Sequence, residues 1–155
     1  MKGDFARFLV FAFVFSFGHM FAGPFFQVYL LESIGLSYTL FVLAQATTTL
    51  GRLASLYHVG HLADIVGDKK IAVISATATA ISPITYLFLT PETFWLVYPI
   101  HFIIGIAWSG IDVTTLNLLI GLSKKSERTL RGAQYYIVNA VPMVIAPIIG
   151  GLVAD

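Results

Sequence analysis

The chain has 155 residues, of which 57% are hydrophobic and 11% charged, and its mean hydropathy is +0.86. A soluble domain usually carries about 25% charged residues, so this composition is typical of a bilayer protein. The net charge of +1 gives no reason to expect nucleic acid as a partner, and the absence of cysteine excludes disulfides and thiolate metal sites.

Long runs without charge separate the charged residues and predict five membrane-spanning helices. Each run reaches the ~20 residues that a spanning helix needs. We expect the helices at residues 8–31, 38–59, 71–89, 93–119 and 132–153. The predicted fold class is therefore an all-α integral membrane protein, with residues 1–155 forming a single transmembrane helical domain.

Positive charges gather on one side of this predicted arrangement. Lys69 and Lys70 follow the second helix and four more basic residues lie in the segment 124–131, whereas the opposite loops carry only Glu32 and Glu92. By the positive-inside rule, the amino terminus and these two basic loops are cytoplasmic. We expect a location in the cell (inner) membrane, with the lipid bilayer as the surroundings.

The fourth predicted helix carries a stripe of polar and small residues at intervals of four, three, four and three: His101, Gly105, Trp108, Asp112 and Thr115. This spacing places them on one helical face. Polar groups in hydrocarbon normally face the bundle interior or a water-filled cavity. His101, Trp108 and Asp112 are therefore candidates for a substrate path, although a histidine or tryptophan can also be hydrogen-bonded filler or an interfacial anchor.

The second and first helices add further polar positions. Gln45, Thr48, Thr49 and Arg52 recur at helical spacing, and His19 lies at the midpoint of the first uncharged run. Gln45 and His19 join the substrate-path candidates. We expect the polar faces of the first, second, fourth and fifth helices to surround one cavity, with the third helix on the opposite side.

Arg52 and Asp112 are expected to form an intramembrane ion pair. Arg52 lies eight residues before Gly60 and Asp112 nine before Gly121, so both sit ~12 Å from the cytoplasmic helix ends. A lone charge at that depth is costly, whereas a hydrogen-bonded pair recovers much of the penalty. Alternatively, Arg52 extends to the interface and Asp112 faces cavity water as a proton or cation site.

The segment GHLADIVGDKK joins the second and third helices. It resembles the signature loop of the major facilitator superfamily of secondary transporters, roughly G-x-L-A-D-R-x-G-R-K, although Ile65 and Asp68 replace two usual arginines. The resemblance implies a cytoplasmic gating loop made by Gly60, Asp64, Gly67, Lys69 and Lys70. A solvated turn with flanking lysines is the alternative.

Other segments resemble particular helices of the same superfamily. Ala146-Pro147-x-x-Gly150-Gly151 is similar to the end of a fifth or eleventh helix, and residues 117–123 look like the end of a tenth. His101 stands where the fourth helix of an amino-terminal half often has an arginine, which favours the carboxyl-terminal half. The chain thus resembles helices seven to eleven, a partial six-helix half and hence a fragment.

The resemblance implies part of a secondary active transporter that moves a small solute, of unknown identity, by alternating access. Its partners would be the missing half or helices. The alternative is a non-transporting membrane fragment or assembly partner. We expect no enzyme, no catalytic residue and no cofactor, because no nucleophile elbow, H-E-x-x-H pair or carboxylate dyad is present. No metal is expected either, since Gly60 at a helix end interrupts His58, His61 and Asp64.

Overall fold

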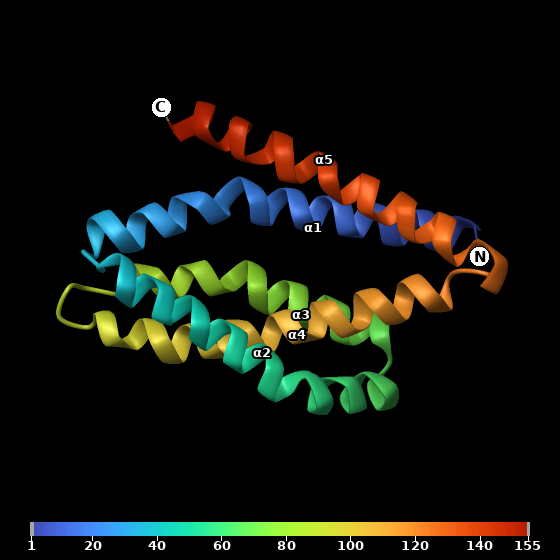
Figure 1. Ribbon diagram of the computed structural model, residues 1–155, viewed down its shortest axis with the longest axis horizontal. Helices are drawn as coiled ribbons and strands as arrows, with labels where there is room; N and C mark the ends of the chain where they lie inside the picture. The colour runs from blue at the N-terminus through green and yellow to red at the C-terminus, as the bar shows by residue number, and fades with distance from the viewer. Residues whose placement is uncertain (1, 155) are drawn as a thin grey trace. The chain divides into compact units, whose positions relative to one another are not determined.

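The structure, a computed structural model, describes residues 2–154 and consists of helices joined by short turns (Figure 1). The elements are α1 Lys2–Val28, η1 Tyr29–Ser33, α2 Tyr38–Val66, α3 Asp68–Ile81, η2 Ser82–Phe88, η3 Phe94–Leu96, α4 Val97–Gly121, η4 Lys125–Glu127 and α5 Arg128–Ala154. η1 is a π-helical turn, and η2, η3 and η4 are 3-10 turns. The predicted all-α fold with five helices is confirmed, and these residues contain no strand.

Local chemistry explains several of the helix boundaries. The Oγ of Ser37 accepts a hydrogen bond from the N–H of Leu40 at 3.3 Å and so caps the start of α2. Pro83 lies in the first turn of η2. Because proline lacks an N–H and clashes with the preceding helical turn, it ends the α-helical pattern of α3 and leaves a 3-10 continuation.

Four helical segments within the described chain are long and apolar enough to cross a bilayer: Gly3–Ser33, Asp68–Phe88, Phe94–Gly121 and Lys125–Val153. α2 does not reach the same hydropathy, because Gln45, Arg52 and three consecutive threonines lie within it. Its 29 residues are nevertheless about 43 Å long. α2 is thus long enough to span, but its polar face needs another helix against it.

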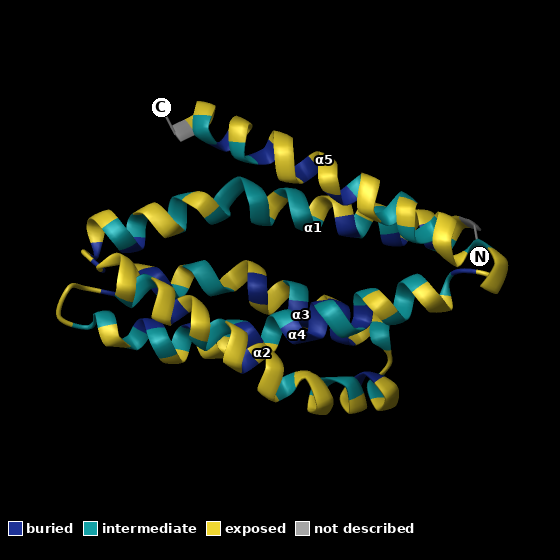
Figure 2. Cartoon of the chain, in the orientation of Figure 1, coloured by how far each residue is buried: buried dark blue, intermediate teal, exposed yellow. Residues whose placement is uncertain are grey.

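Residues 25–115 form one compact unit. Thr48 of α2 contacts His101 of α4, and further along both helices Ser55 contacts Ser109. Because later residues of α2 contact later residues of α4, the two helices are parallel. α3 runs antiparallel to α4 (Figure 1), with Ser75 beside Gly110. Seven residues of α4 are buried, more than in either of its neighbours, which makes α4 the central helix of this unit (Figure 2).

An apolar core closes one end of the same unit, where η1, η2 and the starts of α2 and α4 meet. Its buried members are Leu30, Ile34, Leu36, Ala44, Tyr86, Leu89 and Val97. The core brings Tyr86 of η2 next to the buried start of α4. From this position the hydroxyl of Tyr86 reaches the ring of His101.

The remaining described residues, up to 24 and from 116 onward, form a second compact unit in which α1 and α5 lie together. The guanidinium carbon of Arg131 lies 4.5 Å from the ring centroid of Phe5. Further along, the Oγ of Ser16 donates to Oδ1 of Asn139 at 2.5 Å. Because the later residue of α1 contacts the later residue of α5, the two helices are parallel. Met1 and Asp155 lie outside the described residues, and the single domain over residues 1–155 stays a prediction.

Candidate functional site

A bidentate ion pair joins α2 to α4. Arg52 donates from Nε to Oδ2 of Asp112 and from Nη2 to Oδ1, the latter at 2.6 Å. The guanidinium carbon of Arg52 lies 6.0 Å from the ring centroid of Trp108. A fork of charge-assisted hydrogen bonds is stronger than neutral contacts. Because the two side chains keep 47% and 33% of their surface exposed, part of the pair stays open on the surface of the unit.

His101, on the same helix as Asp112 and eleven residues before it, lies in a buried hydrogen-bonded cluster. Its Nδ1 is 2.8 Å from the Oγ1 of Thr48, and its Nε2 is 3.0 Å from the hydroxyl of Tyr86. A neutral imidazole offers one donor and one acceptor, and both ring nitrogens are engaged here. His101 is 4% exposed. The geometry favours a structural role for this histidine, which ties η2 and α2 to α4.

The backbones of α2 and α4 approach each other at two glycines. A Cβ on Gly51 would overlap the carbonyl oxygen of Phe102, and one on Gly105 would overlap the carbonyl oxygen of Thr48. Between these helices, the Oγ of Ser55 donates to that of Ser109 at 2.8 Å. Small residues permit such contact between membrane helices. The polar faces of α2 and α4 therefore meet each other, and only the outer part of the interface stays accessible.

The sequence model of the Major Facilitator Superfamily matches residues 8–155. The chain belongs to the Major Facilitator Superfamily. A search of curated proteins and a search of solved structures give no significant match. Superfamily members are transporters and not enzymes, so the chain is an integral membrane protein with a transporter-type function.

The segment that resembles the superfamily's signature loop, residues 60–70, is more helical than the sequence predicts. α2 continues through Gly60 and Asp64 to Val66, and α3 begins at Asp68. The expected loop is thus wrong in extent, because the chain turns at the single residue Gly67. With φ of 98°, Gly67 adopts a conformation that side chains disfavour. Lys69 and Lys70 are exposed in the first turn of α3.

Two other substrate-path candidates occupy different surroundings. Gln45 is exposed on α2, one turn before Thr48. His19 is partly buried on α1, where its ring stacks on Phe15 with centroids 6.5 Å apart. His19 belongs to the unit that contains α1 and α5, whereas Gln45 belongs to the unit of residues 25–115. A cavity shared by the first, second, fourth and fifth helices of this superfamily member stays a prediction.

Several polar partners were not among the predicted site residues. Tyr86 and Ser109 complete the hydrogen bonds of the α2–α4 interface, and Asn139 joins α5 to α1. Gly51-x-x-x-Ser55 and Gly105-x-x-x-Ser109 are small-residue spacings that indicate helix contact. Asn139 was detectable as a lone amide in an apolar run. No cluster of three or more His, Cys, Asp or Glu residues in the described chain has metal-site geometry.

Proposed function

We propose that this chain is part of a secondary active transporter that moves a small solute across the cell membrane by alternating access. The observation that carries the proposal is the Arg52–Asp112 pair, a charged contact between α2 and α4 within one helical unit. Charged residues at membrane depth typically mark the pathways of solutes and ions. The superfamily match over residues 8–155 supports the same function.

The role that we propose for each polar side chain follows from how exposed that side chain is. Asp112 and Trp108 are partly exposed and Gln45 is exposed, so these side chains can meet a solute in the pathway. His101 is buried, and we assign it to positioning α4 against α2. His19 stays a candidate on α1. Rocking of two helix bundles would then expose the pathway to each side of the membrane in turn.

Measurements of solute uptake test whether the Arg52–Asp112 pair takes part in transport. Cells expressing the complete gene product are given a panel of labelled solutes, and uptake is compared with that of Asp112→Asn, which keeps the shape but removes the charge. Loss of uptake of one solute class, at equal abundance in the membrane, is expected. Uptake that is unchanged by Asp112→Asn for every solute that the wild-type protein accumulates would contradict the proposal.

Thiol labelling tests alternating access independently of the solute. These 155 residues contain no cysteine, so Gln45→Cys introduces the one thiol of this part of the protein, and any cysteine elsewhere in the complete gene product is replaced by serine. A membrane-impermeant maleimide should label this thiol from either side of the membrane, in right-side-out and in inverted vesicles. Tyr38→Cys, at the start of α2, is the control that should react from one side only. Labelling of position 45 from one side only would favour the alternative, a non-transporting membrane fragment or assembly partner.

A further inference from the structure

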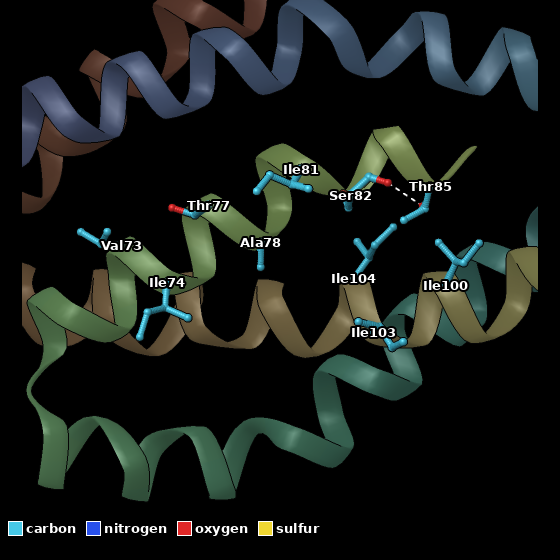
Figure 3. A pocket seen from close by; sticks show the side chains of 10 residues that line it. All are labelled: Val73, Ile74, Thr77, Ala78, Ile81, Ser82, Thr85, Ile100, Ile103 and Ile104. Atoms are coloured by element: carbon cyan, nitrogen blue, oxygen red, sulfur yellow. Dashed lines mark hydrogen bonds between the residues drawn. The ribbon is translucent and has the colours of Figure 1, made fainter. Parts of the chain in front are cut away.

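An apolar groove of about 510 Å³ is lined by α3, η2 and α4, within the unit of residues 25–115 (Figure 3). Its apolar lining consists mainly of Val73, Ile74, Ile81, Ile100, Ile103 and Ile104. Ile100 and Ile104 extend from α4 toward η2. Both walls belong to segments that are apolar enough to span a bilayer. The groove therefore opens at hydrocarbon depth.

The hydroxyl groups at the η2 end of the groove bind the backbone of their own helix. The Oγ of Ser82 donates to the carbonyl oxygen of Thr79 at 2.8 Å, and the Oγ1 of Thr85 donates to that of Ser82 at 2.6 Å. Polar groups that already have hydrogen-bond partners place no demand on a ligand. This part of the groove suits hydrocarbon and offers nothing to orient a polar solute.

Positive charge lies at the other end. Lys69 and Lys70 are exposed in the first turn of α3. Lys70 precedes Val73 by three residues and Thr77 by seven, so it shares the groove face of the helix. Asp68 stands two residues before Lys70 and faces the opposite side of α3. An apolar channel with cations at its mouth is complementary to an anionic amphiphile.

The dimensions also fit a lipid. From Val73 to Ile81 the α-helix rises about 12 Å at ~1.5 Å per residue, and η2 adds about 8 Å up to Thr85 at ~2.0 Å per residue. The total of about 20 Å is close to one leaflet with its headgroup region, half of a bilayer ~40–45 Å thick. A chain entering beside Lys70 would thus reach the middle of the membrane at η2.

We propose that this groove binds one acyl chain of an anionic phospholipid whose phosphate is held by Lys69 and Lys70. The lipid comes from the leaflet that contacts the α2–α3 turn. This is a binding site distinct from the Arg52–Asp112 pair, because the groove lies on the α3 side of α4. Its occupant packs α3 and η2 against the central helix.

Lipid retention tests the site. The purified complete protein is equilibrated with equal amounts of dioleoyl phosphatidylglycerol and dioleoyl phosphatidylcholine, and the lipids that it retains are quantified by mass spectrometry. We expect preferential retention of phosphatidylglycerol. The double substitution Lys69→Gln with Lys70→Gln should reduce that preference by up to about 30-fold, since each lysine near an anionic surface contributes ~1 kcal/mol and 1.4 kcal/mol is tenfold.

Matched controls separate headgroup from acyl binding. Lys124→Gln with Lys125→Gln removes two exposed lysines from the turn after α4, which is remote in sequence from the groove, and should leave the preference unchanged. Ala78→Phe fills the groove and should reduce retention of both lipids, whereas Ala80→Phe, on the same helix but outside the lining, should not. Glycerol 3-phosphate has the headgroup chemistry without the chains and should not displace the lipid. The proposal would be overturned if both double lysine substitutions reduced the preference for phosphatidylglycerol equally, or if glycerol 3-phosphate displaced the lipid.

Photocrosslinking remains informative if the groove-filling variant does not fold. Phosphatidylglycerol with a diazirine in its acyl chain is added to the wild-type protein, and crosslinked peptides are mapped. Crosslinks concentrated on residues 73–85 and 100–104 are expected. Their absence from both segments, as would result if another helix of the protein covered the groove, would refute the site.

Discussion

Removing one member of the Arg52–Asp112 pair should destabilise the protein more than removing both. Asp112→Ala deprives the guanidinium of Arg52 of its carboxylate. Losing one partner of a fully buried pair costs ~3–5 kcal/mol, whereas exposed pairs contribute ~0–1 kcal/mol. With 47% and 33% of the two side chains exposed, we expect a coupling free energy between these limits, about 1–2 kcal/mol.

The measurement is a double-mutant cycle on the free energy of unfolding. Arg52→Ala, Asp112→Ala and the double variant are unfolded in mixed micelles with increasing sodium dodecyl sulfate, and helix loss is followed by circular dichroism. Circular dichroism is preferable to tryptophan fluorescence, because Trp108 lies 6.0 Å from the Arg52 guanidinium and would report local changes.

The pair Glu127–Arg131 supplies the matched control. Its N–O distance is 3.3 Å and the residues are one helical turn apart, so its coupling should be only ~0.3–0.5 kcal/mol. If the cycle on Arg52 and Asp112 gave energies additive within ~0.3–0.5 kcal/mol, the two charges would be energetically independent and our reasoning would be refuted.

Three further predictions concern packing, hydrogen bonding and orientation. Gly105→Ala should lower the free energy of unfolding by ~1–3 kcal/mol because its methyl group overlaps the α2 backbone, whereas Gly18→Ala, which has open space, should not lower it; thermal unfolding of both variants distinguishes them. His101→Phe leaves the hydroxyl of Tyr86 unpaired and should cost ~1–3 kcal/mol, measured in the same way. A single cysteine at Ser126 should react with an impermeant maleimide in inverted vesicles but not in intact cells, and the reverse pattern would invert the predicted orientation.

The sequence predicts the helices better than the turns between them. Uncharged runs locate all five helices, because spanning a bilayer demands length and apolarity. The α2–α3 junction was misplaced because glycine at position 60 costs a helix only ~1 kcal/mol and need not end it. Gly67 does end it, through a φ of 98° that no residue spacing reveals. Which of two glycines terminates a helix therefore depends on the backbone path.

The contact between Arg52 and Asp112 was anticipated from an argument that holds only in part. That argument took Gly60 as the end of the second helix, whereas α2 continues to Val66; the structure nevertheless has the two charges in contact. The partners of His101 depend on how α2, η2 and α4 are rotated about their axes and on the 3-10 turn that carries Tyr86. Sequence periodicity gives one face of one helix, and it does not specify which neighbour meets that face.

The separation of 60 residues between Arg52 and Asp112 has a consequence for biosynthesis. At ~5–20 residues per second, a ribosome completes Asp112 roughly 3–12 s after Arg52. During that interval α2, which is not among the four segments apolar enough to span a bilayer, holds an arginine whose carboxylate partner has not yet been synthesised. We therefore expect α2 to stay at the aqueous interface, or to be shielded by the insertion machinery, until α4 arrives. Delayed integration of α2, and not slow folding of the finished protein, would then set the pace at which this bundle assembles.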